Sequence, residues 1–501
     1  MTVFYVSSGF KTRQEATDLF RCSVRIARCQ SWPLPIRSRR FCNESPAMPA
    51  SNSNVPAVSE TLCRFVAKAS WDDLGENVRD NTLRSLLNYF GTAFAGAHDS
   101  ALDHSVAVLD EFKGKGNATL IGRAETADPL TAAFVNGAAG NVHDFDDTHI
   151  RTVIHPTAPV APALLALAER QKVSGPDFIL ALALGIEAAL RIGNAVSPGH
   201  YARGWHITAT CGVFGAALGA GKILGLDAAK LNCALGAASA QSSGLVETLG
   251  FMAKSIGVGG AARGGLLAAL LAERGLDGPA RPLEGPRGFL RVTGDDPVYD
   301  EVIQGLGKRW EVLRNIHKPY PCGVVLFSVI DGCMELLEEG DIAVDEIARI
   351  TLYGHPLLRQ RADRPDVTTG REAQVSAQHA VAASLTFGAA GLQQFTDAAV
   401  NDPRVLAFRE KVFMKDDGEI DVAGVHMVIE TASGAVHEIS VDGARGTDAR
   451  PLSDDEIETK FSTLSGDCAP DCTRAGELID AIWSLDQSDD VGAIMQMARP
   501  G

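Results

Sequence analysis

The hydrophobic pattern between residues 58 and 274 has the period of α-helices almost throughout. Leu83, Leu86, Leu87 and Phe90 are separated mostly by three- and four-residue steps, which places them on one face of an amphipathic helix. Segments of the same character follow one another with short breaks between them. We therefore expect a series of helices at residues 131–142, 158–171, 177–192, 208–224, 228–243 and 260–274.

Small residues on these segments indicate that the helices pack closely. Gly212, Gly215 and Gly219 recur within one predicted helix. The composition agrees, because aromatic residues make up only 6% of the chain while it contains 50 glycines, which favours packed helices over a β-sandwich. Gly225 and Asp227 supply a C-terminal glycine and an N-cap between two helices.

The pattern changes after residue 310. Apolar and polar residues alternate at 348–353, and two further strand-like segments, 425–431 and 435–441, flank Ser433-Gly434 as in a β-hairpin. Helical segments are expected between these strands, at 372–385 and 402–411. After Ser453 the helical period returns, at residues 454–461, 474–483 and 491–497.

These segments predict a mainly α protein with an α+β lid. A chain of 501 residues is too long for one simple core. The helical pattern at both ends indicates a discontinuous all-helical domain, residues 56–310 and 449–501. The smaller α+β domain, residues 311–448, is then an insertion. No internal repeat of fixed period is evident.

Residues 1–47 differ in kind from the rest of the chain. They contain eight Lys and Arg residues against three acidic ones, and they end near Arg39-Arg40-Phe41. Such a leader resembles a mitochondrial presequence. The alternative is that Met48 is the true start of a cytoplasmic protein. Both readings leave the leader outside the fold and give a mitochondrial or cytoplasmic location.

Charge and cysteine content exclude several classes of protein. The net charge of −16 argues against a nucleic-acid partner, although a small acid needs only a local group of cations. The ten cysteines include no CxxC pair, so neither a zinc ribbon nor the usual iron–sulfur run is present. No uninterrupted apolar stretch reaches the roughly 18 residues of a membrane span, and no membrane partner is expected.

Three aspartates and three histidines lie within 13 residues, from His143 to His155. Carboxylates so close together repel one another, so some must be shifted in pKa or paired with cations. A diphosphate site of the isoprenoid-synthase type would need a second aspartate-rich run, which the sequence lacks. A solvated acidic helix cap remains an alternative, as does a metal site formed by Asp144, Asp147, His149 and His155.

Cationic residues with a suitable setting occur in three later motifs. His206 precedes a predicted helix whose N-terminal amides can face an anion. Lys254 precedes a glycine-rich helix start that leads to Arg263. That glycine run is neither a dinucleotide fingerprint nor a Walker loop, since no strand precedes it. Lys318 lies in a segment stiffened by Pro319 and Pro321.

The order of these motifs resembles the MmgE/PrpD family over about residues 59–463. That family includes 2-methylcitrate dehydratases, cis-aconitate decarboxylases and an iminodisuccinate epimerase. The resemblance implies a helical domain with an α+β lid, a homodimer, and a cleft between the domains. The motifs that carry it are His143-Asp-Phe-Asp-Asp-Thr-His149 with His155-Pro156, Arg203-Gly-Trp-His206, Ala253-Lys254 followed by Ala262-Arg263, and Lys318-Pro-Tyr-Pro-Cys-Gly323.

Carried over by position, the family's site falls on a small set of residues. One further position, usually tyrosine in the decarboxylases, falls on His379. Histidine can donate or accept a proton, but with a different pKa and reach, so the type of reaction stays open. The other positions are Asp144, Thr148, His155, His206, Lys254 and Lys318.

The chemistry expected of this set needs no cofactor and no metal. Lys254, Lys318 and Arg263 would bind carboxylates and stabilise an enolate-like charge. Asp144 would orient a histidine, and the proton carriers would be His155, His206 and His379. We therefore predict a lyase acting on a small polycarboxylate, with dehydration of 2-methylcitrate or another alkylcitrate favoured. The alternatives are a cis-aconitate-type decarboxylase, an epimerase of an iminodisuccinate-like diacid, and a non-catalytic binding protein.

Overall fold

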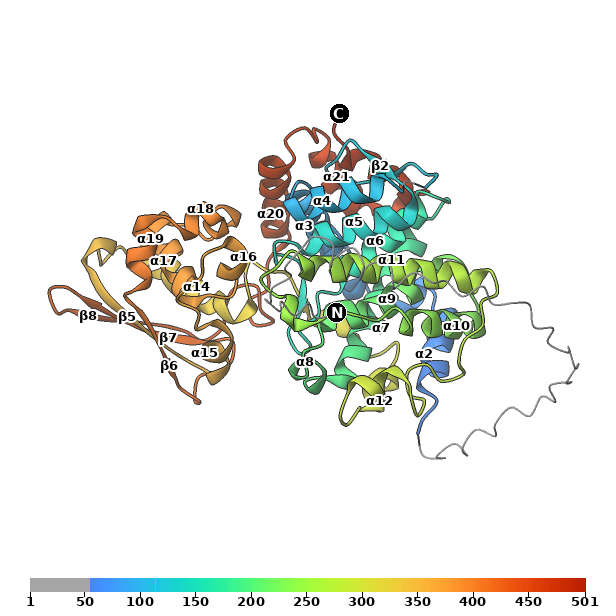
Figure 1. The fold of residues 1–501 in the computed structure, drawn as a ribbon, viewed down its shortest axis with the longest axis horizontal. Helices are drawn as coiled ribbons and strands as arrows, with labels where there is room; N and C mark the ends of the chain where they lie inside the picture. Colours follow the sequence, from blue (N-terminus) through green and yellow to red (C-terminus); the bar gives the residue numbers. More distant parts are fainter. Residues whose placement is uncertain (1–54, 113) are drawn as a thin grey trace, which may run out of the picture. The chain divides into compact units, whose positions relative to one another are not determined.

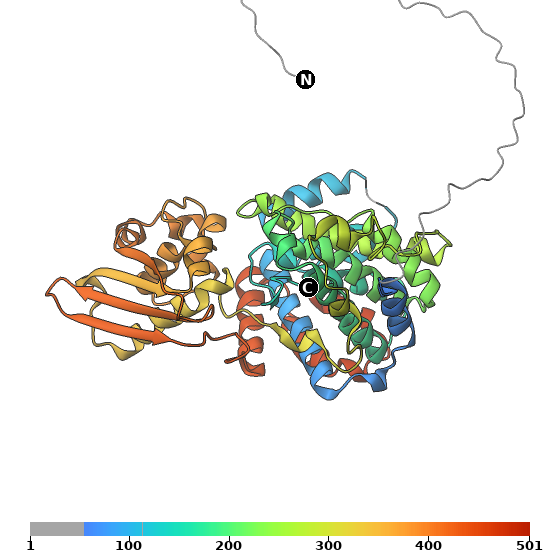
Figure 2. The same cartoon turned by 90° about the horizontal axis from the view of Figure 1, so that it is seen from below.

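The computed structural model describes residues 55–112 and 114–501. Residues from Val55 onward form one compact unit, whose elements are shown in Figure 1 and, from a second direction, in Figure 2. The predicted leader, residues 1–47, lies outside the described residues. The expected mitochondrial or cytoplasmic location therefore stays a prediction.

Helices dominate the chain up to residue 303 and again after residue 453, as the hydrophobic period predicts. The helices of this part are α2 (Val58–Lys68), α3 (Glu76–Gly96), α4 (Ser100–Asp110), α5 (Pro129–Asn141), α6 (Thr157–Ala168), α7 (Gly175–Val196), α8 (Gly199–Ala202), α9 (Ile207–Ile223), α10 (Ala228–Ser239), α11 (Ala253–Glu273), α12 (Phe289–Thr293), α13 (Tyr299–Ile303), α20 (Asp454–Cys468) and α21 (Ala475–Trp483). The last predicted helix, 491–497, is a 3-10 helix over Val491–Ala498.

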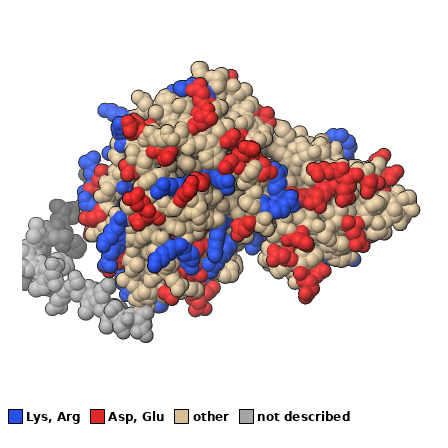
Figure 3. All heavy atoms as spheres, turned by 180° about the vertical axis from the view of Figure 1, so that it is seen from behind, with Lys and Arg blue, Asp and Glu red and all other residues tan. Residues whose placement is uncertain are grey.

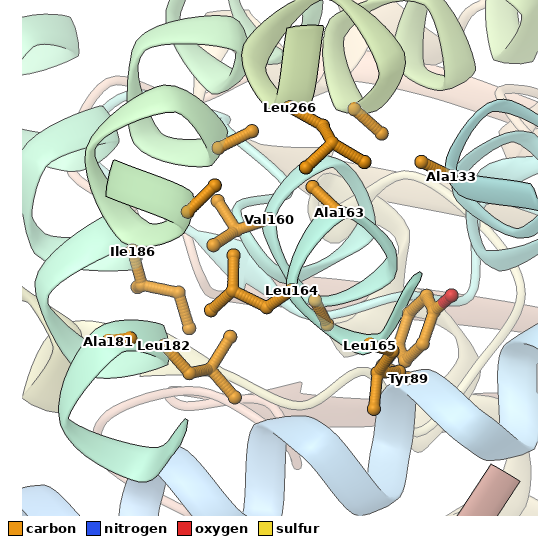
Figure 4. Packing of buried hydrophobic residues seen from close by; sticks show 14 of the residues in the cluster. Tyr89, Ala133, Val160, Ala163, Leu164, Leu165, Ala181, Leu182, Ile186 and Leu266 are labelled. Carbon is orange, nitrogen blue, oxygen red and sulfur yellow. The ribbon is translucent and has the colours of Figure 1, made fainter. Parts of the chain in front are cut away.

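Helix α6 lies at the centre of this part, and all of its residues are buried. It contacts α3, α5, α7, α9 and α11. Figure 4 shows Leu164 and Val160 of α6 near Leu182 and Ile186 of α7. Burying one leucine side chain completely contributes about 1.5–3 kcal/mol. The buried core around α6 therefore fixes the helix ends between which the loops described below begin and end.

Glycines let the surrounding helices approach at backbone distance. A Cβ atom added at Gly215 of α9 would lie 2.5 Å from the carbonyl oxygen of Gly185 in α7. One added at Gly265 of α11 would lie 2.7 Å from the carbonyl oxygen of Val213. Any side chain at these two glycines would force the helices apart, as the small-residue pattern indicates.

Two helices, α7 and α11, are long and apolar enough to cross a membrane. The most apolar window of α7 is 100% buried inside the protein and that of α11 is 61% buried. Core helices of a globular protein pass the same test of length and hydropathy, and the packing around α6 accounts for both.

A four-stranded sheet forms the centre of the second part of the chain. Its order is β6 (Val412–Asp416), β5 (Ile347–Gly354), β7 (Val425–Thr431) and β8 (Val436–Val441), with β5 and β6 parallel and the other pairs antiparallel. The predicted hairpin is confirmed, and Gly434 takes the positive φ of 88° that its turn requires. Strand β6 was not predicted, because five residues with little alternation carry no local strand signal.

Helices α14 (Phe327–Glu339) and α17 (Ala377–Phe387) pack on this sheet and on each other, as Figure 1 shows. The helix expected at 372–385 is divided into α16 (Gly370–Ala373) and α17, because Ser376 caps a new helix by accepting a hydrogen bond from the amide of His379. The remaining helices are α15 (Pro356–Ala362), α18 (Asp397–Val400) and α19 (Pro403–Arg409).

The buried apolar residues of these two parts form separate cores. The first runs from Val58 to Val312 and resumes from Leu452 to Ala498, whereas the second lies between Ile316 and Ala444. The predicted fold class is confirmed: the protein is mainly α and carries a smaller α+β domain. The two parts are called the helical domain and the α+β domain below; the exact boundaries proposed from the sequence stay predictions.

Candidate active site

The cluster of aspartates and histidines lies on one loop between α5 and α6, residues 142–156, which we call the acid loop. Asp144 has a φ of 53°, a left-handed conformation that aspartate tolerates better than most residues. The short strand β3 (Thr148–His149) pairs antiparallel with β4 (Asn315–Ile316). This pairing brings the segment that carries Lys318 against the acid loop.

Asp144 is the centre of a buried group of charges. Its Oδ1 accepts a hydrogen bond from Nζ of Lys254 at 2.5 Å, and its Oδ2 lies 3.1 Å from Nζ of Lys318. The side chains of Asp144, Lys254 and Lys318 are 14%, 10% and 1% exposed. Burial alone would raise the pKa of Asp144, but the two lysines hold it well below its usual range. The cluster therefore contains an ionised carboxylate held between two ammonium groups.

Lys318 is fixed by more than this ion pair. Its Nζ also donates to the carbonyl oxygens of Asp144 at 2.8 Å and of Cys322 at 3.2 Å. Nζ of Lys254 has only the carboxylate of Asp144 as a hydrogen-bond acceptor among the described residues. Burial would lower the pKa of Lys254, but Asp144 raises it above its usual value. Lys318 is thus held by more hydrogen bonds than Lys254.

His155 faces the same carboxylate. Its Nδ1 lies 3.0 Å from the carbonyl oxygen of Asp147, and its Nε2 lies 3.6 Å from Oδ1 of Asp144. Because a carbonyl oxygen only accepts, Nδ1 carries the proton and Nε2 carries the free lone pair in the neutral ring. Burial lowers the pKa of His155, although Asp146 opposes this. His155 is therefore neutral near pH 7 and able to accept a proton at Nε2.

Two further predicted residues lie beside His155. Thr148 places its hydroxyl 3.0 Å from Nδ1 of His155. His206 occupies the N-cap position of α9 without a side-chain capping hydrogen bond, and its Nδ1 is buried without a hydrogen-bond partner in the part of the chain that the structure describes. Burial lowers the pKa of His206 to about 3, and the charge of Lys254 contributes to the shift. His206 is a second neutral histidine, close enough to Lys254 and His155 to respond to their charges.

The side chain of Asp147 connects the acid loop to α6 and to β4. Its Oδ2 accepts hydrogen bonds from Oγ1 of Thr157, at 2.5 Å, and from the side-chain amide of Asn315. Burial, together with the neighbouring Asp146, raises the pKa of Asp147 to about 7. The acid loop thus carries one carboxyl group with a lowered pKa and one with a raised pKa, a separation typical of sites that move protons.

Arg263 does not belong to this cluster, which corrects the prediction from the glycine-rich motif. It is exposed on α11, and its guanidinium carbon lies 5.3 Å from the ring centroid of Phe134. Nine residues separate it from Lys254, which on an α-helix corresponds to about 13 Å and roughly half a turn around the axis. The two side chains therefore leave the helix on opposite faces.

The structure places His379 in the core of the α+β domain, away from the acid loop. Its Nε2 donates to the carbonyl oxygen of Gln394 at 2.8 Å, and its ring packs against Phe395 with centroids 5.3 Å apart. Burial lowers its pKa to about 4. Among the described residues no contact joins its ring to Asp144 or to His155, so the predicted catalytic role of His379 lacks geometric support here.

Two further residues near the cluster were not predicted from the sequence. Tyr201 of α8 is half-buried; burial raises its pKa, which also responds to the charges of Arg361 and Asp144. It lies two residues before the predicted Arg203–His206 motif, a position that could have drawn attention. Lys460 of α20 binds the backbone of the acid loop, and no local signal distinguishes it from other helix lysines.

Three ligand atoms could hold a metal ion by their spacing. Asp144, Asp146 and His155 each offer one atom, and these atoms lie within 4.8 Å of one another. However, both oxygens of Asp144 already face the ammonium groups of Lys254 and Lys318, which would repel a metal cation. The two ammonium groups beside this donor set therefore disfavour a metal ion.

The cationic groups of the site are local, in a chain of negative net charge. On the face shown in Figure 3, acidic side chains gather over the α+β domain, while basic and acidic side chains are mixed over the helical domain. Lys254 and Lys318 are buried instead. An anionic ligand would therefore be recognised by these two buried lysines rather than by a basic surface.

Comparison with known proteins agrees with this architecture. Residues 60–301 match the MmgE/PrpD N-terminal domain and residues 320–485 match the MmgE/PrpD C-terminal domain. A cis-aconitate decarboxylase-like protein of Aspergillus oryzae is 29% identical over 88% of this chain and 97% of its own length. The cis-aconitate decarboxylase of Aspergillus terreus is 28% identical (89% and 97%), and that of Mus musculus is 27% identical (88% and 93%).

The two family models together span most of the chain, and each motif that carries the resemblance contributes a residue to the cluster around the acid loop, whereas the side chains of Arg203 and Arg263 are exposed elsewhere. The chain therefore belongs to the MmgE/PrpD family and is an enzyme of the lyase type.

Proposed function

We propose that this lyase acts on a small polycarboxylate, and that decarboxylation of a cis-aconitate-like tricarboxylate is its reaction. The observation that carries the proposal is the carboxylate of Asp144, held between Lys254 and Lys318 beside the neutral ring of His155. A substrate carboxylate can use the same two ammonium groups. The names of the relatives, all of them cis-aconitate decarboxylases or similar to one, support this choice of reaction.

The reaction asks for charge stabilisation and one proton. Breaking the bond to the departing carboxylate releases carbon dioxide and leaves an electron pair, which spreads across the adjacent double bond and its carboxylate. Lys254 and Lys318 would stabilise this charge. A proton added at the far carbon of the allylic system completes the product. The carboxylates of a bound substrate would raise the pKa of His155, so that it can deliver this proton.

A second candidate, dehydration of 2-methylcitrate or another alkylcitrate, rests on a different observation. Elimination of water needs one group to remove the proton next to a carboxylate and another to protonate the departing hydroxide. His155 and His206 are two neutral histidines near the same lysine. His379 stands where the decarboxylases usually have a tyrosine. Dehydration and epimerisation therefore remain candidate reactions.

The experiment is incubation of the full-length protein with cis-aconitate, 2-methylcitrate, citrate and iminodisuccinate, followed by proton NMR in deuterated water. Carbon dioxide release with one deuterium per product molecule supports the decarboxylase. A new alkene from 2-methylcitrate without carbon dioxide supports the dehydratase instead, and deuterium exchange without a new alkene supports an epimerase. His155→Gln serves as the inactive control. If no substrate reacts in the unmodified protein, the proposal is wrong.

The resemblance also implies a homodimer, which stays part of the proposal. Sedimentation equilibrium of the purified protein measures the mass directly, and a monomer at micromolar concentration would contradict it.

A further inference from the structure

Lys460 connects three segments that are far apart in the sequence. It lies on α20, and its Nζ donates to Oδ1 of Asn88 at 2.7 Å, to the carbonyl oxygen of Phe145 at 2.7 Å and to that of Lys318 at 2.9 Å. An ammonium group has three hydrogens to donate, and each finds one acceptor. These partners belong to α3, to the acid loop and to the segment after β4.

The same side chain also packs on the acid loop. Its Nζ lies 3.7 Å from the ring centroid of Phe145, a cation–π contact. The ring of Phe145 is buried against Leu464, one turn further along α20. Residues four apart on a helix share a face, so Lys460 and Leu464 together hold Phe145 from one side.

Phe145 directly follows Asp144, the residue at the centre of the site. Asp144 keeps its φ of 53°, a conformation that costs about 1–3 kcal/mol and persists only where the surroundings fix it. Nζ of Lys318 binds the carbonyl oxygen of Asp144, and Nζ of Lys460 binds the next carbonyl oxygen and that of Lys318 itself. Lys460 thus fixes the backbone of both members of the Asp144–Lys318 ion pair.

Electrostatics alone does not explain a lysine at this position. Burial lowers the pKa of Lys460 well below its usual range, and the charge of Lys318 lowers it further, while Asp146 and Asp147 oppose this. A leucine or methionine would avoid that cost. The three acceptors would then lack a donor, and the amide nitrogen of Asn88 already has no partner among the described residues.

We propose that Lys460 is a positioning residue of the active site, which sets the distance between Asp144 and Lys318 by binding the carbonyl oxygens of Phe145, the residue after Asp144, and of Lys318. Among the described residues, its Nζ contacts Asn88, two backbone carbonyl oxygens and the ring of Phe145, and no side chain assigned to the reaction. Its effect would pass through the geometry of the ion pair, and a displacement of about 1 Å at such a site can reduce a rate about 100-fold. This inference rests on the proposed function only for its kinetic test.

The kinetic test compares Lys460→Met, Lys460→Arg and a control on the same helix. Phe461→Leu is the control, because Phe461 packs on Phe94 with centroids 5.8 Å apart, and among the described residues no ring contact joins it to Phe145. We expect Lys460→Met to lower kcat about 100-fold with KM changed less than about threefold, and Lys460→Arg to recover at least tenfold of that loss. Phe461→Leu should keep kcat while lowering thermal stability. Unchanged kcat in Lys460→Met would overturn the proposal, as would equal losses in Lys460→Met and Phe461→Leu.

A second measurement does not depend on finding the substrate. Hydrogen–deuterium exchange of the full-length protein should show faster exchange in peptides covering 142–150 and 315–322 in Lys460→Met. In Phe461→Leu the increase should be confined to α20 and α3. If exchange in the two site segments is the same in the unmodified protein and Lys460→Met, Lys460 does not position them. If exchange rises but no substrate reacts, the proposed function fails while the positioning role stands.

Discussion

Replacing Asp144 with asparagine tests the reasoning about the buried cluster most directly. Asparagine has the same size and also tolerates a positive φ, so the backbone conformation at this position is retained. Only the negative charge is removed. Lys254 and Lys318, whose side chains are 10% and 1% exposed, are then left close together without their common carboxylate.

The expected loss of stability is about 3 kcal/mol. At an effective dielectric constant of about 20, two unit charges about 3 Å apart attract by roughly 5 kcal/mol, and desolvation offsets much of this gain. Removing one partner of a buried ion pair costs about 3–5 kcal/mol. Asp144 keeps 14% exposure, which places the estimate at the lower end of that range.

The low pKa of Asp144 determines how its contribution to the free energy of unfolding changes with pH. The pKa of Asp144 in the folded protein lies far below its value in the unfolded chain, which is about 3.9. Its stabilising contribution is therefore fully present above about pH 4 and is lost as the pH falls further, by about 1.4 kcal/mol per unit. Between pH 5 and 7 the difference between the two proteins should be constant.

The assay is urea unfolding of the unmodified protein and Asp144→Asn at several pH values from 7 to 3. Glu187→Gln is a matched control, since Glu187 forms a buried ion pair with Arg191 at 2.5 Å and burial raises its pKa instead of lowering it. Only Asp144→Asn should lose turnover, and only its loss of stability should shrink as the pH falls below about 4. A difference below about 1 kcal/mol for Asp144→Asn at pH 7, or one that does not shrink below pH 4, would refute the reasoning.

Three further predictions concern other residues of the site. Asp147, whose pKa is raised to about 7, binds a proton more tightly when folded; its contribution is therefore present at low pH and is lost between about pH 4 and 7. Asp147→Asn should accordingly gain up to about 4 kcal/mol relative to the unmodified protein over that range, and parallel unfolding curves would contradict this. His155→Gln should lower kcat by about 100- to 10,000-fold. In the unmodified protein kcat/KM should fall as the pH rises through the pKa of His155, because the ring must be protonated to deliver its proton. Burial lowers this pKa, so the fall should begin below pH 6.5, and a fall that begins above that value would assign it to another group. Arg263→Ala should change kcat and KM less than about twofold, because the side chain is exposed on the far face of α11; a tenfold rise in KM would return Arg263 to the site, as a residue that binds substrate carboxylate.

Most of the fold could be predicted because its signals are local. The helical period identified α5, α6, α7 and α9, and Ser433-Gly434 identified the hairpin of β7 and β8. Strand β6 could not be found in this way, since its parallel pairing with β5 joins residues about 60 positions apart. The interruption before α17 was missed because the cap at Ser376 falls within an unbroken helical period.

The members of the candidate site could be predicted where each lies in a recognisable motif. This holds for Asp144, His155, Lys254 and Lys318, which the structure brings together, while their catalytic roles stay predictions. Arg263 was included for its place in the motif, although its spacing from Lys254 already put it on the opposite helix face. Lys460 was not found, because only tertiary packing shows which helix lysine lies over the acid loop.

The different fixation of the two site lysines suggests how the cluster receives an anion. When a substrate carboxylate competes with Asp144, Lys318 keeps its bonds to the carbonyl oxygens of Asp144 and Cys322, so its ammonium group stays in place. Lys254 loses its hydrogen bond to the carboxylate of Asp144 and can follow the substrate. Oδ1 of Asp144, released from Lys254, still lies 3.6 Å from Nε2 of His155, where its charge favours the protonated ring. Substrate binding would thereby turn His155 from a proton acceptor into a proton donor, which is what a decarboxylation requires after carbon dioxide has left.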